Sequence, residues 1–220
     1  MTTIWLTRHA ETSAPTVFHG AESDIGLSDL GRRQAAAAAG WFAPLGVTAV
    51  VSSGMLRARD TAAPVAAACG APHRIEPDLH ERRVGALSGT AFSSTGGPWP
   101  ETIDRWEAGD TAFTTPGAES FEDLRRRLVP AVARVAAAHP GGRVVVVAHG
   151  VVCKVLLLCL LPGYGPGAWK RLGRVPNLAV STLTHAGGGG WGAAGLLDLP
   201  PPVAALSGGA PTGVGEKSQG

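Results

Sequence analysis

The sequence has few cysteines: only Cys69, Cys153 and Cys159 are present. An odd number without a short Cys-x-x-Cys spacing argues against both a disulfide framework and a zinc site. We therefore expect free thiols, mostly buried and in a reducing compartment. No other spacing of histidines and acids resembles a metal site. The sequence thus predicts neither a metal nor another cofactor.

Long apolar runs and a strong net charge are also missing. The longest apolar run, Val155 to Leu161, is far too short to span a bilayer. The first six residues enter a strand-like run without the basic region of a signal peptide. A net charge of +2 indicates neither nucleic acid nor an anionic membrane as the main partner. We expect a cytoplasmic protein, and nothing in the sequence indicates its oligomeric state.

What the sequence does contain is enough apolar material for one domain. Its 220 residues are 45% hydrophobic, and short buried strands alternate with helices. This alternation predicts an α/β three-layer sandwich, in which helices flank a mostly parallel sheet. Strands are expected over 4–7, 47–52, 73–76, 143–148, 178–184 and 192–197. Helices are expected over 29–42, 55–69, 121–138 and 150–161.

Prolines and glycines set the remaining expectations. Pro64 should kink or divide its helix, and Pro130 should interrupt the hydrogen bonding of another. The stretch 79–116 is expected to be irregular, with one or two helical turns near 101–106. Because Pro, Gly, Ala and Ser dominate after residue 199, we expect a domain over 1–199 and a disordered tail over 200–220.

Charged residues follow two of the expected strands at the point where each ends. Arg8 and His9 come directly after the first strand, and His149 follows the four-valine strand. Ligands of open α/β sheets bind at the carboxyl ends of strands, so these groups can meet a phosphate. Arg57 stands near the start of a helix, where anions are favoured, and guanidinium groups match phosphate oxygens. Glu81 supplies an acid from a loop.

At this point the chain resembles the histidine phosphatase superfamily, also called phosphoglycerate mutase-like. The signature of that family is Arg-His-Gly-Glu-Thr, and this chain has Arg-His-Ala-Glu-Thr at 8–12. Each further motif is weak alone, but all occur in the family's order. They lie at 27–35 (Leu-Ser-x-x-Gly-x-x-Gln-Ala), 53–62, 81–85 (Glu-x-x-x-Gly), 116–120 and 148–150 (Ala-His-Gly).

The resemblance implies a role for each of these residues. His9 would attack phosphorus and become phosphohistidine, while Arg8, Arg57 and His149 would bind the phosphoryl oxygens. Glu81 would protonate the leaving oxygen and then help to deprotonate water. The partner would be a small phosphorylated substrate. His19 and Arg82 are further candidates for substrate binding.

Departures from the family pattern favour its phosphatase branch over its mutases. Mutases usually carry Trp-Asn where this chain has Ala14-Pro15, and polar residues where it has Val151-Val152. The segment 88–116 reads as a partly apolar, lid-like insertion or pocket wall. Two alternatives stay open: phosphoglycerate mutase-type phosphoryl transfer and a non-catalytic phospholigand-binding module. Outside the site, we expect 125–127 to be a solvated helix face and Glu119 and Ser120 to cap a helix.

Overall fold

The computed structural model describes residues 1–91, 97–188 and 190–207, and it confirms the predicted α/β class. Six strands form one sheet in the order β3-β2-β4-β1-β5-β6. The first four strands of this order are parallel to one another. At the β1 edge, β5 pairs antiparallel with β1, and β6 pairs antiparallel with β5. The strands are β1 Thr2–Arg8, β2 Ala49–Ser52, β3 His73–Ile75, β4 Arg143–Ala148, β5 Val180–His185 and β6 Trp191–Asp198.

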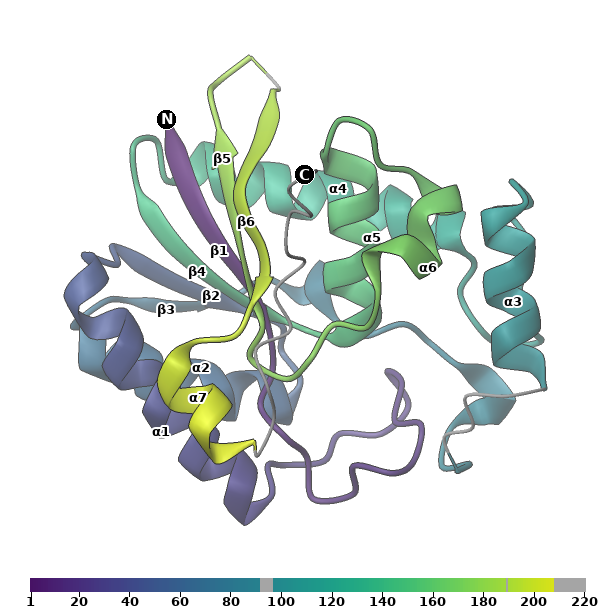
Figure 1. Ribbon diagram of the computed structural model, residues 1–220, viewed down its shortest axis with the longest axis horizontal. Helices are drawn as coiled ribbons and strands as arrows, with labels where there is room; N and C mark the ends of the chain where they lie inside the picture. Colours follow the sequence, from purple (N-terminus) through teal and green to yellow (C-terminus); the bar gives the residue numbers. More distant parts are fainter. Residues whose placement is uncertain (92–96, 189, 208–220) are drawn as a thin grey trace, which may run out of the picture.

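Helices cover both faces of this sheet, as the predicted three-layer sandwich requires (Figure 1). One face carries α1, α2 and α7, and the other carries α4 and α5. The helices are α1 Asp29–Phe42, α2 Leu56–Cys69, α3 Pro98–Glu107, α4 Phe121–Ala138, α5 Gly150–Leu160, α6 Trp169–Leu172 and α7 Pro201–Leu206.

Strand β4 shows why the sequence gives this layered arrangement. Successive side chains of a strand point to opposite faces, so a strand buried on both sides must be apolar throughout. Val144 and Val146 pack into the core beneath α4 and α5, while Val145 and Val147 pack beneath α1 and α2. All four valines are fully buried. The central strand therefore joins two separate hydrophobic layers.

Side-chain caps are present at the starts of α1 and α4, as the sequence predicts. The Ser28 hydroxyl accepts from the backbone N–H of Gly31 at the start of α1. At the start of α4, Ser120 and Asp123 form a reciprocal capping box, which confirms Ser120 as the cap.

Helix α2 is not divided at Pro64, since it continues from Leu56 to Cys69 with Ala62, Val65 and Ala66 buried on either side, and the expected kink stays a prediction. Two further expectations about helices were wrong. Helix α3 spans ten residues rather than one or two turns. The start of the predicted disordered tail is a helix, α7, whose Val203 is fully buried in the layer beneath α1. Residues 208–220 lie outside the described residues.

Candidate active site

The two site histidines meet because β1 and β4 are parallel neighbours. Arg8 pairs with Ala148 in the sheet register, so His9 and His149 both lie one residue beyond this pair. The backbone N–H of His9 donates to the Ala148 carbonyl at 2.9 Å. The centroids of the two imidazole rings are 5.2 Å apart in an edge arrangement. The structure therefore brings together the residues that the sequence placed after two separate strands.

The contacts of the His9 ring fix which nitrogen carries its proton. Its Nδ1 lies 2.7 Å from the Ala10 carbonyl oxygen, which can only accept, so Nδ1 donates and Nε2 keeps a lone pair. The Asn177 side-chain amide donates to the His9 carbonyl at 2.8 Å and holds the backbone there. Burial, followed by the charges of Arg8 and Arg57, lowers the pKa of His9 well below 6.5. The imidazole is therefore neutral at physiological pH.

His149 lies against Ser53. The fully buried Ser53 hydroxyl accepts from the Met55 N–H, and its oxygen lies 2.8 Å from His149 Nε2. The buried Nδ1 of His149 has no partner among the described residues, and it carries the ring proton when the Ser53 hydroxyl donates to Nε2. Burial and the charge of Arg57 lower the pKa of His149 well below 6.5. A neutral imidazole with one unpartnered ring nitrogen is thus held beside His9.

Two guanidinium groups flank these rings, the buried one of Arg57 and the half-buried one of Arg8. Arg57 is 1% exposed and donates to the carbonyls of Ser23 and Gly20, which aims it rigidly. Arg8 donates to the Val175 carbonyl, while its buried Nε has no partner within the described ranges. Burial lowers the pKa of both groups, but arginine starts so high that it remains a cation. The site therefore holds two fixed positive charges beside a neutral nucleophile.

Arg8, His9 and Arg57 line one cleft with a volume of about 640 Å³, whereas the fully buried His149 lies behind its lining. Arg8, His9, Arg57 and Glu81 line its floor, and α3 forms a wall with Trp99, Pro100 and Ile103. The segment 88–116 thus contributes a partly apolar pocket wall, as expected, although residues 92–96 lie outside the described residues. Trp106 of the same helix is fully buried in the core instead.

The two candidate substrate contacts also line this cleft. Both ring nitrogens of His19 have partners within its own loop, the Ser23 hydroxyl and the Ala14 carbonyl. Arg82 is 1% exposed and lies beside the rings of Trp99 and Trp106, with its guanidinium carbon 4.9 and 5.3 Å from their centroids. Burial lowers its pKa to about 10, so it remains charged. Its Nη1 has no partner in the described part of the chain, which leaves one donor available.

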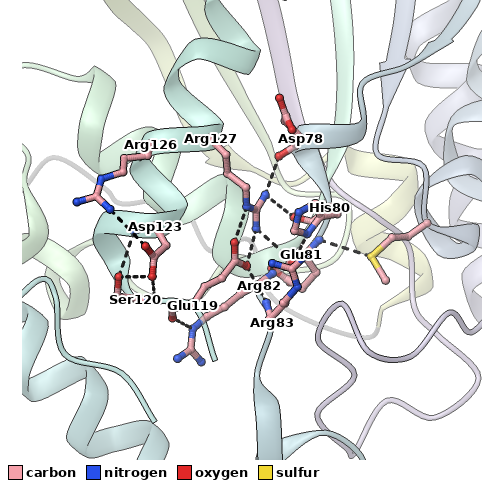
Figure 2. Close-up of polar contacts among 11 residues, drawn as sticks. Asp78, His80, Glu81, Arg82, Arg83, Glu119, Ser120, Asp123, Arg126 and Arg127 are labelled. Atoms are coloured by element: carbon pink, nitrogen blue, oxygen red, sulfur yellow. Dashed lines mark hydrogen bonds and ion pairs between the residues drawn. The ribbon is translucent and has the colours of Figure 1, made fainter. Parts of the chain in front are cut away.

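The loop that carries Glu81 is held from behind by Arg127 (Figure 2). The Arg127 guanidinium donates to the carbonyls of Asp78, His80 and Glu81 and forms an ion pair with Glu119 at 2.7 Å. Only 14% of the Arg127 side chain is exposed. The expected solvated face over 125–127 is therefore wrong at Arg127, and Glu119 is an ion-pair partner rather than a helix cap.

Replacing Arg127 with methionine should destabilise the protein by about 2–4 kcal/mol, because it leaves a buried carboxylate and three loop carbonyls without their cation. Chemical denaturation monitored by circular dichroism would measure this loss. Arg126→Met is the matched control, since Arg126 is solvent-exposed and its surface ion pairs should contribute no more than about 0.5 kcal/mol. Equal effects of the two substitutions would contradict the bracing role of Arg127.

Comparison with known proteins identifies the family of this chain. The family model described as histidine phosphatase superfamily (branch 1) matches residues 4–195. The chain belongs to the histidine phosphatase superfamily. Its curated relatives include a protein named as a phosphatase and proteins named as probable phosphoglycerate mutases. In the described residues, no helix combines the length and apolar character that crossing a membrane requires.

Three superfamily relatives illustrate the similarity. The bifunctional protein Rv2228c of Mycobacterium tuberculosis is 37% identical over 187 residues, which cover 84% of this chain and 50% of that protein. This chain thus spans about half the length of that relative. The metal-independent phosphoserine phosphatase of Arabidopsis thaliana is 38% identical over 167 residues, covering 72% of this chain and 68% of that protein. The mycobacterial glucosyl-3-phosphoglycerate phosphatase, solved with inorganic phosphate, superposes with a TM-score of 0.76 at 29% identity, covering 90% and 97% of the two chains.

Proposed function

We propose that this protein hydrolyses a phosphomonoester of a small metabolite through a phosphohistidine at His9, without a metal ion. One observation carries the proposal: His9, a neutral imidazole whose Nε2 is unprotonated, lines a cleft together with the guanidinium groups of Arg8 and Arg57. A neutral nitrogen can attack phosphorus, and fixed cations stabilise the charge that spreads over the phosphoryl oxygens.

In the first step, His9 Nε2 forms a bond to phosphorus while the ester P–O bond breaks. Arg8, Arg57 and the Nδ1–H of His149 stabilise the phosphoryl oxygens. Glu81, which lines the same cleft, donates its proton to the leaving oxygen. In the second step, the Glu81 carboxylate takes a proton from water, whose oxygen attacks phosphorus. The P–N bond then breaks, which releases inorganic phosphate and restores the neutral imidazole.

Water is favoured as the acceptor over a second phosphorylated metabolite. Pro15 and Val151 line the cleft at the positions where mutases carry polar side chains, so these positions offer no side-chain hydrogen bonds that would retain a bisphosphate. The relative named a metal-independent phosphoserine phosphatase supports the same choice. His19 and Arg82 would contact the rest of the substrate, Arg82 through its unused Nη1.

The purified protein should hydrolyse p-nitrophenyl phosphate at an unchanged rate after exhaustive treatment with EDTA, because arginines supply the charge that a metal would otherwise supply. Release of nitrophenolate, followed by its absorbance, measures this directly. Loss of activity on chelation and its recovery with a divalent metal would overturn the metal-independent mechanism. Isomerisation of a phosphoglycerate in the presence of its bisphosphate would instead support the mutase alternative, and phosphate binding without turnover would support a binding module.

A further inference from the structure

Lys154 is a buried cation that the proposed chemistry does not use. It lies on α5, is 8% exposed and lines the same cleft as His9. Its ammonium donates one hydrogen bond, to the Gly173 carbonyl at 2.5 Å, and lies 4.6 Å from the Trp169 ring centroid. No carboxylate among the described residues forms an ion pair with it. A lysine this deeply buried normally has such a partner.

The position of Lys154 on α5 relates it to the phosphoryl site. Gly150, at the first turn of α5, packs so close to Arg8 that a Cβ there would lie 3.4 Å from the Arg8 Nε. Lys154 follows Gly150 by four residues and therefore lies on the same helix face, about 6 Å further along. A group bound by Lys154 would thus lie in the same cleft as the ester oxygen of a substrate held by Arg8.

Arg174 provides a second cation at this end of the cleft. It follows Gly173, whose carbonyl holds Lys154, and it lines the cleft while remaining exposed. Its guanidinium makes no hydrogen bond or ion pair with any described residue. Its charge contributes to the lowered pKa of Arg8, after burial, so the two groups are close. Lys170 also lines the cleft, but it pairs with Asp104 and Glu107 of α3.

The charge of the cleft exceeds what a single phosphoryl group needs. Six cationic and three carboxylate side chains line it: Arg8, Arg57, Arg82, Lys154, Lys170 and Arg174 against Glu11, Glu81 and Asp104. With neutral histidines, the difference is three positive charges, whereas a phosphomonoester carries about two negative charges at most. The cleft therefore has the charge to balance one more anionic group.

We propose that Lys154 and Arg174 form a second anion site, which selects substrates that carry a carboxylate or a second phosphate on a short carbon chain beyond the ester oxygen. This inference deepens the proposed function and rests on it. Burial lowers the pKa of Lys154 to about 8, so the ammonium stays mainly charged at neutral pH and its unused N–H groups can bind an oxyanion. Trp169 would pack against the carbon chain between the two anionic ends.

Three substrates whose leaving group is a primary three-carbon alkoxide test this site: propyl phosphate, 3-phosphonooxypropanoate and propane-1,3-diyl bisphosphate. The unmodified protein should have a kcat/KM at least about tenfold higher for one of the two charged compounds, as expected for one charge-assisted contact. The compound that gains more shows whether the site takes a carboxylate or a phosphate. Lys154→Met and Arg174→Gln should each reduce this advantage to about threefold or less, and Lys154→Arg should retain it.

Arg171→Gln is the matched control, because Arg171 is a nearby exposed cation that stacks on Tyr164 and does not line the cleft. It should keep the full advantage. Equal kcat/KM values for the three compounds in the unmodified protein, or an undiminished advantage in both Lys154→Met and Arg174→Gln, would overturn the inference. If hydrolysis itself fails, calorimetric binding of the three compounds to the unmodified protein still decides whether the second site exists.

Discussion

Changing His9 to alanine should lower phosphomonoester hydrolysis by about 10⁴-fold or more, because it removes the atom that accepts the phosphoryl group. The substitution should leave the fold intact, since the His9 backbone bonds to Ala148 and Asn177 do not involve the ring. Steady-state assays would give the rate, and acid-labile labelling of the quenched protein with ³²P would report the intermediate. We expect labelling of the unmodified protein and none of the variant.

His185→Ala is the control for this experiment, because His185 stacks on Trp191 in the β5–β6 hairpin and does not line the cleft. Its activity and labelling should match those of the unmodified protein. Phosphorylation of the His9 variant at another residue would show that a different group is the nucleophile. Turnover by the unmodified protein without any trapped phosphohistidine would point instead to direct attack by water.

Changing Glu81 to glutamine should lower kcat for an alkyl phosphate by about 10²–10⁴-fold, because an alkoxide leaves poorly without a proton. Glutamine keeps the size of the side chain and an oxygen for the Arg82 backbone N–H, which donates to Glu81 at 2.9 Å. With p-nitrophenyl phosphate, whose leaving group needs no proton, the first step should be almost unaffected. The phosphoenzyme should then accumulate, because the second step still needs a base.

A stopped-flow burst of nitrophenolate in the Glu81 variant is the distinguishing measurement. Glu122→Gln serves as the control, since Glu122 lies on α4, outside this cleft, and pairs with Arg125. An equal loss of the first-step rate on both kinds of substrate would show that Glu81 does not act by protonating the leaving oxygen. Another acid facing the cleft would then have to be sought.

The parts of the fold that the sequence predicts are those with strong local signals. The run of four valines marks β4, and Ser28 and Ser120 cap α1 and α4 at the residues expected. The site residues near His9 could be placed because each follows a strand or starts a helix. The sheet then brings those ends together, as parallel pairing requires.

The residues that support the site could not be found this way, because their partners lie far away in the sequence. Three consecutive arginines look equivalent at 125–127, but each step along a helix turns by about 100°, so only Arg127 faces the Glu81 loop. Ser53 and Asn177 are ordinary polar residues until the fold places them against His149 and His9. The Pro- and Gly-rich composition after residue 199 likewise gives no sign of α7. Within that helix, Val203 is the one buried residue, and it packs into the core.

The pairing of β1 with β4 also has a consequence for how the protein is made. His149 follows His9 by 140 residues, and no nearer segment of the described chain takes the place of β4 beside β1. Ribosomes add about 5–20 residues per second, so the nascent nucleophile would wait roughly 7–28 seconds for its neighbour to be synthesised. The proposed phosphatase activity should therefore emerge only after β4 has been synthesised, so that it would report the pairing of β1 with β4 on ribosome-bound chains.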